Sequence, residues 1–118
     1  MTIIGKEDEL LSNIFMAKYN ILDSRLYKME IFDENFLLVI DLYFELITNG
    51  TPIKLRFYDV QEYGFYWKDR TNFYIERYKL FRVKELFYLS IDPVDEENQF
   101  KLEDNDFIWS KSIEGYLL

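Results

Sequence analysis

Residues 25–60 read RLYKMEIFDENFLLVIDLYFELITNGTPIKLRFYDV, and their apolar side chains recur at every second position. Three segments of this stretch, residues 25–32, 36–47 and 53–60, share the period of two. Successive side chains of an extended strand point to opposite faces of a sheet, so this alternation is typical of strands that bury one face. The stretch therefore predicts three antiparallel strands in succession.

Turn residues occupy both breaks between these strands. Asp33, Glu34 and Asn35 separate the first two segments, and Asn49-Gly50 lies between the second and the third. Asn and Gly accept the positive φ angles that tight hairpin turns require. The short connections predict a meander, in which strands that are neighbours in sequence are neighbours in the sheet.

The rest of the chain adds a helix and further strands. Residues 7–18 place apolar residues on one helical stripe and so predict a short N-terminal helix: Leu10, Leu11, Ile14 and Phe15, with Lys18 in the same register. Later strands are expected over residues 63–67 and 73–81, joined by a turn at 68–72, and over residues 86–91 and 107–118. The expected fold is mainly β. We expect one domain over residues 1–118, an antiparallel meander of six to seven strands that forms a sandwich or a partial barrel.

The missing residue types exclude several chemistries. The 118 residues contain neither cysteine nor histidine. This excludes disulfides, cysteine-ligated zinc, cysteine nucleophiles and imidazole bases. The four glycines are isolated, so no phosphate-binding glycine motif occurs. We expect no cofactor, no metal and no enzymatic activity.

Targeting signals are missing from the sequence as well. The N-terminus has no basic region followed by an apolar stretch, as a signal peptide would have. The longest apolar run, residues 36–40, is far shorter than the roughly 20 residues that span a bilayer. We therefore expect a cytoplasmic protein with no membrane contact.

The net charge of −8 is concentrated near the C-terminus. Residues 92–118 carry 8 acidic and 2 basic residues, whereas residues 1–91 carry 14 acidic and 12 basic ones. Such a distribution repels nucleic acid and anionic membranes and attracts basic surfaces. We expect a basic protein partner, with a homodimer as the alternative. The predicted partner-binding residues are Asp92, Asp95, Glu96, Glu97, Glu103, Asp104 and Asp106.

The charged residues suggest three other interpretations. Asp41 and Glu45 share one face of a predicted strand, but a spacing of four residues sets them roughly 13 Å apart, too far for a pair of hydrolytic carboxylates. The sequence around Asp104 and Asp106 lacks the oxygen ligand and the glycine of a calcium-binding loop. Turn formation explains the same residues, because Asp and Asn side chains accept hydrogen bonds from nearby backbone.

One basic and aromatic tract, residues 63–82, could stack on nucleic acid or support self-association. It contains five bases, Lys68, Arg70, Arg77, Lys79 and Arg82, and eight aromatic residues. Aromatic side chains also suit the half-buried faces of an ordinary sheet, and the acidic chain as a whole repels phosphate. A sheet face covered by cation–π contacts is therefore the expectation here.

The C-terminal third, FYLSIDPVDEENQFKLEDNDFIWSKSIEGYLL, resembles the C-terminal part of small acidic bacterial proteins. The shared elements are Ser90-Ile91-Asp92-Pro93 at a strand end, the acidic loop, and Asp104-Asn105-Asp106 before the last strand. In size, acidity and β content the chain is similar to immunity proteins, which neutralise bacterial toxins. That resemblance implies a non-catalytic inhibitor of a basic toxin.

Overall fold

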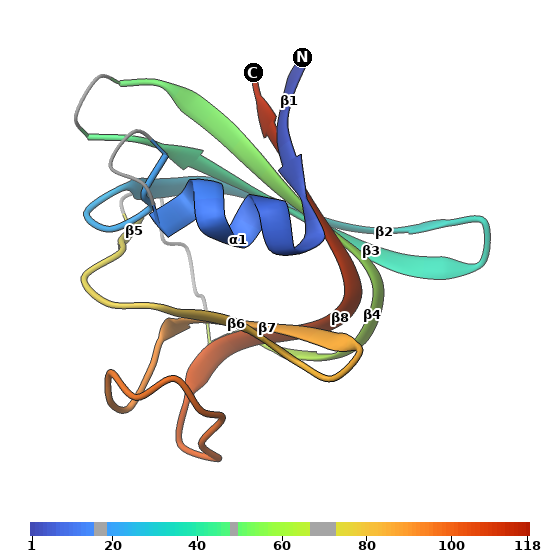
Figure 1. Cartoon of the computed structure of the whole chain (residues 1–118), viewed down its shortest axis with the longest axis vertical. Helices are drawn as coiled ribbons and strands as arrows, with labels where there is room; N and C mark the ends of the chain where they lie inside the picture. The colour runs from blue at the N-terminus through green and yellow to red at the C-terminus, as the bar shows by residue number, and fades with distance from the viewer. Residues whose placement is uncertain (16–18, 48–49, 67–72) are drawn as a thin grey trace.

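The computed structural model of the chain describes residues 1–15, 19–47, 50–66 and 73–118, which form one curved antiparallel sheet with one helix (Figure 1). In chain order the elements are β1 (Thr2–Lys6), α1 (Glu7–Phe15), β2 (Arg25–Glu34), β3 (Leu37–Glu45), β4 (Pro52–Gly64), β5 (Phe73–Tyr74), β6 (Lys79–Val83), β7 (Leu86–Asp92) and β8 (Asn105–Leu117).

The sheet curls into a half-barrel with the strand order β5-β2-β3-β4-β8-β7-β6, and β1 pairs with β8 as well (Figure 1). This confirms the predicted mainly β fold and, of the two alternatives, the partial barrel. The meander is confirmed for β2, β3 and β4. Beyond β4 the order departs from a meander, because the C-terminal strand β8 lies between β4 and β7 in the middle of the sheet.

Strand β4 continues to Gly64, past the end expected at Val60. A bulge lies between Val60 and Glu62, and Asp59 just before it has a φ of 53°. Such a bulge interrupts the alternation of buried and exposed side chains while the pairing with β8 continues. The prediction of a separate strand at 63–67 is therefore wrong: Tyr63 and Gly64 belong to β4, and Phe65 and Tyr66 lie outside any strand. Trp67 and the predicted turn at 68–72 lie outside the described residues.

The strand predicted at residues 73–81 is divided into β5 and β6, at opposite ends of the strand order. Between them the chain leaves the sheet at Ile75, which is fully buried. The Ile75 N–H donates to the Ser24 carbonyl at 2.9 Å, and its carbonyl accepts from the Asp23 N–H at 2.7 Å. These bonds hold the crossing segment against the chain before β2, so the apolar side chain at 75 fills the interior.

Helix α1 crosses the concave side of the half-barrel (Figure 1). It follows the prediction over Glu7–Phe15, whereas residues 16–18 lie outside the described part of the chain. Leu10 and Ile14 are fully buried in the cluster that contains the inward residues of β3, β4 and β8. A Cβ atom built on Gly115 would lie 2.5 Å from Leu10 Cδ1 and 2.9 Å from Ile4 Cγ1. Glycine at 115 therefore allows the helix to pack closely on β8.

The hairpin of β2 and β3 projects beyond the half-barrel, to the right in Figure 1. Its two-residue turn consists of Asn35 and Phe36, with φ angles of 52° and 67°. The second predicted turn is Asn49-Gly50. Asn49 lies outside the described residues, and Gly50 has the positive φ, 65°, that such a turn requires. No helix in the described ranges is long and apolar enough to cross a membrane.

Replacement of Gly115 by alanine tests the packing of α1 on the sheet. The added methyl group would collide with Leu10 and Ile4, so we expect Gly115→Ala to lower the free energy of unfolding by about 1–3 kcal/mol. Urea denaturation measures this loss, with Lys111→Ala at an exposed position of β8 as the control. Equal stability of the two variants would contradict the close packing.

Candidate functional site

The connection from β7 to β8, residues 93–104, lies against a second cluster of side chains on the sheet. Along β7, Phe87 and Leu89 enter the main core, and alternation turns Tyr88 to the opposite face. The Tyr88 ring centre lies 4.5 Å from that of Trp109 and 5.6 Å from that of Phe100. Phe100 belongs to the connection itself, so the loop covers the buried Tyr88.

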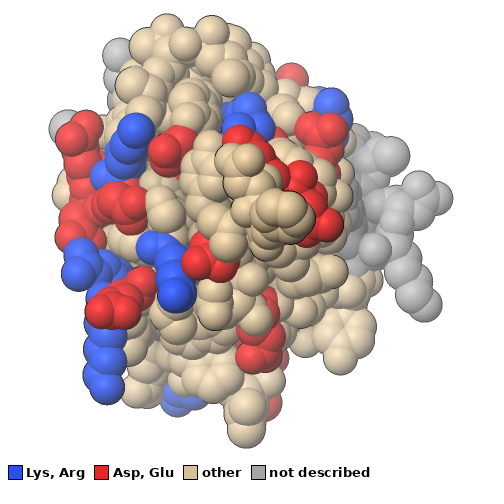
Figure 2. Space-filling model, turned by 90° about the vertical axis from the view of Figure 1, so that its right-hand side faces the viewer, with Lys and Arg blue, Asp and Glu red and all other residues tan. Residues whose placement is uncertain are grey.

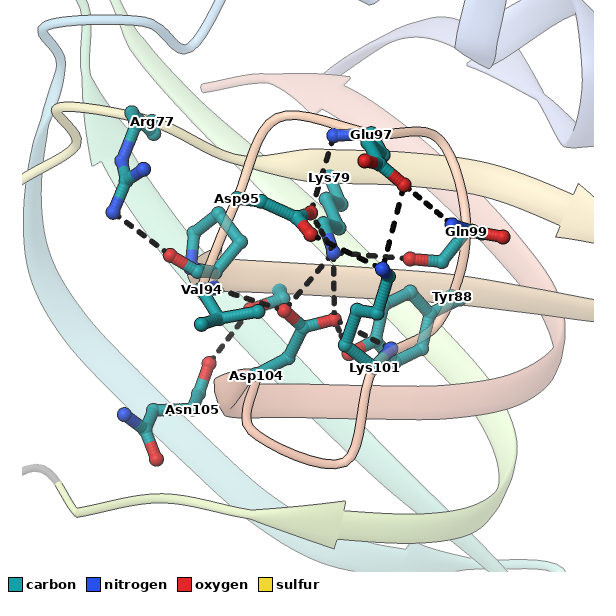
Figure 3. Close-up of polar contacts among 12 residues, drawn as sticks. Arg77, Lys79, Tyr88, Val94, Asp95, Glu97, Gln99, Lys101, Asp104 and Asn105 are labelled. Atoms are coloured by element: carbon teal, nitrogen blue, oxygen red, sulfur yellow. Dashed lines mark hydrogen bonds and ion pairs between the residues drawn. The ribbon is translucent and has the colours of Figure 1, made fainter.

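The ammonium group of Lys79 lies at the centre of the loop's polar contacts (Figure 3). Its side chain is 1% exposed, and Nζ donates to Asp104 Oδ1 at 3.0 Å and to the Gln99 carbonyl at 3.0 Å. Asp95 Oδ1 lies 2.8 Å from the same nitrogen. Three acceptors from one loop thus surround one cation on the edge strand β6.

Asp104 fixes both ends of the loop. Its oxygens accept from the Tyr88 hydroxyl at 2.8 Å, from the Val94 N–H at 3.0 Å and from the Lys101 N–H at 3.1 Å, in addition to the bonds from Lys79. The carboxylate is therefore saturated by donors from three segments of chain. This agrees with the turn-forming role that the sequence allows for this residue.

A more exposed layer of contacts surrounds this centre. Lys101 Nζ lies 3.4 Å from Asp95 Oδ2 and 3.4 Å from Glu97 Oε2. Asp95 Oδ1 also accepts from the Glu97 N–H at 3.2 Å. Arg77 donates to the Pro93 carbonyl at 2.9 Å, next to a cavity of about 340 Å³ beside β5. The loop is held at its start, middle and end.

These contacts keep the central groups charged. Burial by itself would lower the pKa of Lys79, but hydrogen bonds to Asp95 and Asp104 raise it above its ordinary value. Burial by itself would raise the pKa of Asp104, yet its donors, chiefly the Val94 N–H and the Tyr88 hydroxyl, hold that pKa below the ordinary value. The pKa of Asp95 is lowered mainly by its hydrogen bond with Lys79. These charged groups together form an ionic clamp that holds the loop on the sheet.

The seven residues predicted to bind a partner are divided by the structure. Four are exposed: Asp92, Glu96, Glu97 and Glu103. Asp95 is partly exposed. Asp104 is 5% exposed and Asp106 is 1% exposed, and Asp106 accepts the Tyr66 N–H at 2.7 Å. As a correction, Asp104 and Asp106 position the loop and the adjoining chain, and neither offers its carboxylate to solvent.

The sequence interpretation missed Lys79, Tyr88 and three apolar residues of the loop. Val94, Phe100 and Leu102 are 47%, 41% and 87% exposed, so apolar surface lies among the exposed acids. The sequence does show these three residues as apolar positions within an acidic segment, and that pattern could have identified them. The sequence places Lys79 in a basic tract, because nothing near residue 79 indicates that its partner is Asp104, 25 residues later.

The alternative sites have structural partners of their own. Both oxygens of Asp41 bind Arg56, at 2.7 and 2.8 Å, and Glu45 lies 3.5 Å from Arg25. Each of these two carboxylates thus has its own cation. In the described parts of the chain, no three Asp or Glu side chains are grouped so that they could hold a metal ion.

In the basic tract of residues 63–82, each of the three described bases has a partner within the chain. Lys68 and Arg70 lie outside the described residues. Lys79 is inside the clamp, Arg77 binds the Pro93 carbonyl, and Arg82 Nη1 lies 2.6 Å from Asp8 Oδ2. These bases hold other segments of the chain in place.

Comparisons with known proteins identify no relative of the chain. No family model matches the chain, and no curated protein or solved structure is significantly similar to it.

Asparagine at position 104 tests the ionic clamp. The change removes one buried charge and leaves Asp95 as the only carboxylate beside the Lys79 ammonium, so we expect Asp104→Asn to lower the free energy of unfolding by about 2–3 kcal/mol. The adjacent exposed variant Glu103→Gln is the matched control and should change stability by less than about 0.5 kcal/mol. Urea denaturation of both proteins makes the comparison. Similar losses in the two variants would contradict the clamp.

The clamp also predicts how stability depends on pH. Because the pKa values of Asp95 and Asp104 are lowered by folding, their contribution is present above the unfolded value of about 3.9 and is lost as the pH falls through the folded values. We expect the free energy of unfolding to decrease below about pH 4, with a shallower decrease in Asp104→Asn. Denaturation at a series of pH values measures both slopes. Parallel curves would show that Asp104 does not contribute.

Proposed function

We propose that the protein is a non-catalytic binding protein whose loop at residues 93–104 contacts a basic protein partner. The observation that supports this proposal best is the ionic clamp, because it orders the loop before any partner arrives. A preorganised loop loses little conformational entropy on binding. The same loop exposes three acids, Glu96, Glu97 and Glu103, which we call its rim acids, and two apolar side chains, Phe100 and Leu102.

The chemistry of this surface fits a partner with lysine and arginine around an apolar depression. Interfaces commonly combine a few apolar anchors with a charged and solvated rim. The internal ion pairs of Lys79 and Lys101 neutralise part of the loop. The acids that remain exposed give it a negative field, which speeds encounters with a basic surface and makes them sensitive to salt.

The partner class that we favour is a basic bacterial toxin, which the chain would bind and block as an immunity protein does. This choice rests on the likeness of the C-terminal third to small acidic bacterial proteins and on charge complementarity. A toxin that acts on nucleic acid must present a basic site, and an acidic loop of fixed shape could occupy such a site. The cytoplasm is the compartment in which we place this encounter.

Immobilised protein should retain a basic protein from a lysate of the native cell at low salt and release it at about 1 M salt, where screening acts within about 3 Å. The partner, identified by mass spectrometry and purified, then serves for kinetic measurements. Retention of no basic protein, or of one whose binding is unchanged at high salt, would contradict the proposal.

Charge reversal at two rim positions tests where the partner binds. We expect Glu96→Lys with Glu103→Lys to slow association with the purified partner about tenfold or more, because the attractive field is reversed locally. The control pair, Glu62→Lys with Glu85→Lys, changes the net charge equally at exposed positions outside the loop. Stopped-flow or surface-binding kinetics give the rates. Equal slowing by both pairs would mean that the loop has no special part in recognition.

A further inference from the structure

Among the described residues, the outer edge of β2 has a strand partner only at Arg25 and Leu26, where β5 pairs with it. On the other side, β3 pairs with β2 from Arg25 to Glu34. Among the described residues, the backbone N–H and C=O groups that point outward from Lys28 to Glu34 therefore have no strand partner. An edge of this kind is a template for another strand.

The projecting hairpin also exposes apolar side chains near this edge. Ile31 is 41% exposed and Leu37 is 44% exposed. Phe36 is fully exposed at 104% and has a φ of 67°, a left-handed conformation that favours glycine and is unfavourable for a bulky residue. An aromatic ring at this position costs stability in the isolated chain, and its full exposure means that no packing within the described residues offsets that cost. Figure 2 faces the side of the molecule from which the hairpin projects and shows much uncharged surface between the charged side chains.

We propose that this edge binds a second copy of the chain, so that two β2 strands pair antiparallel across a two-fold axis at Ile31. Directly opposite residues of an antiparallel pair lie on the same face and interact. The axis sets Lys28 opposite Glu34 of the second copy, twice by symmetry, and sets Ile31 opposite its own equivalent. The half-exposed isoleucines thereby cover one another. This interface is independent of the proposed loop function.

Neighbouring registers are less favourable. An axis at Glu30 places two glutamates opposite each other, and an axis at Phe32 places Glu30 opposite Glu34 of the second copy. An axis at Met29 moves Asp33 of the second copy to Arg25, where β5 is already paired. The register at Ile31 avoids the facing acids, and its paired residues, Lys28 to Glu34, leave Arg25 and Leu26 to β5.

The same register accounts for the exposed ring of Phe36. The turn of one copy comes level with Leu26 of the other, whose neighbour in the sheet is Phe73 of β5. Tyr74, next in β5, is 49% exposed. The ring of Phe36 thus extends over an aromatic strand end of the second copy. Pairing over about seven residues buries a small area, so we expect a reversible dimer rather than an obligate one.

Sedimentation velocity of the full chain alone, over about 5–500 µM at physiological salt, tests the proposal with a second copy as the probe. We expect the sedimentation coefficient to rise with concentration from the monomer value toward the dimer value. Amide hydrogen exchange from Lys28 to Glu34 should slow over the same range. A monomer at every concentration, or a dimer without this protection, would overturn the proposal.

Ile31→Lys should abolish the dimer, because it places two ammonium groups opposite each other. The matched control is Val83→Lys on β6, the opposite edge of the sheet, where the side chain is 43% exposed; it should leave association unchanged. Thermal unfolding of both variants shows that each remains folded. Equal loss of association in both would overturn the proposed edge.

A charge swap tests the register. Lys28→Glu and Glu34→Lys should each weaken the dimer about tenfold, because each places like charges opposite at both symmetric positions. The double variant should regain the affinity of the parent chain. Failure of the double variant to recover would exclude the axis at Ile31.

Phe36→Gly distinguishes the contribution of the Phe36 ring to dimerisation from that of the paired β2 strands. Glycine suits the left-handed turn, so this variant should melt at a higher temperature as a monomer and yet dimerise less. Stronger dimerisation would contradict the contact of Phe36 with β5. The loop variant Glu96→Lys with Glu103→Lys should dimerise normally, and Ile31→Lys should bind the basic partner normally, so a failure of either proposal is recognised separately.

Discussion

The buried ammonium group of Lys79 holds the connection between β7 and β8 in its observed form. Without that cation, Asp104 would keep a charge inside the protein with only neutral donors, and Asp95 would lose its shortest contact. Buried ion pairs seldom add much net stability, since desolvation offsets attraction, but breaking one is costly. Their value here is specificity: few other loop conformations satisfy one ammonium and two carboxylates together. The cover over Tyr88 and the orientation of the exposed acids both depend on this.

The local parts of the fold were predictable from the sequence, and the non-local parts were not. Alternation identified β2, β3 and the first half of β4, because each buries one face and turns within two to six residues. Placement of β8 between β4 and β7 has no local signal, since it depends on pairing between strands about fifty residues apart. The bulge after Asp59 hid the second half of β4, because it changes which positions are buried without ending the pairing.

In the candidate site, too, local features were predictable from the sequence and contacts with distant residues were not. Acidic composition drew attention to the loop, and Glu96, Glu97 and Glu103 are exposed there. Composition could not show that Asp104 turns inward, because charged side chains are ordinarily exposed and its partner, Lys79, belongs to another strand. The net charge of the loop was therefore a poor measure of the charge available to a partner: part of it is neutralised inside the protein.

The pairing of β1 with β8 brings Thr2 opposite Leu117, so the two ends of the described chain leave the sheet side by side. In Figure 1 both ends lie at the top, and the loop of the ionic clamp lies at the bottom. A short peptide could therefore join the two ends and allow new termini to be opened elsewhere, without disturbing that loop. Fluorescent labels or a solid support attached at either end would likewise stand away from it.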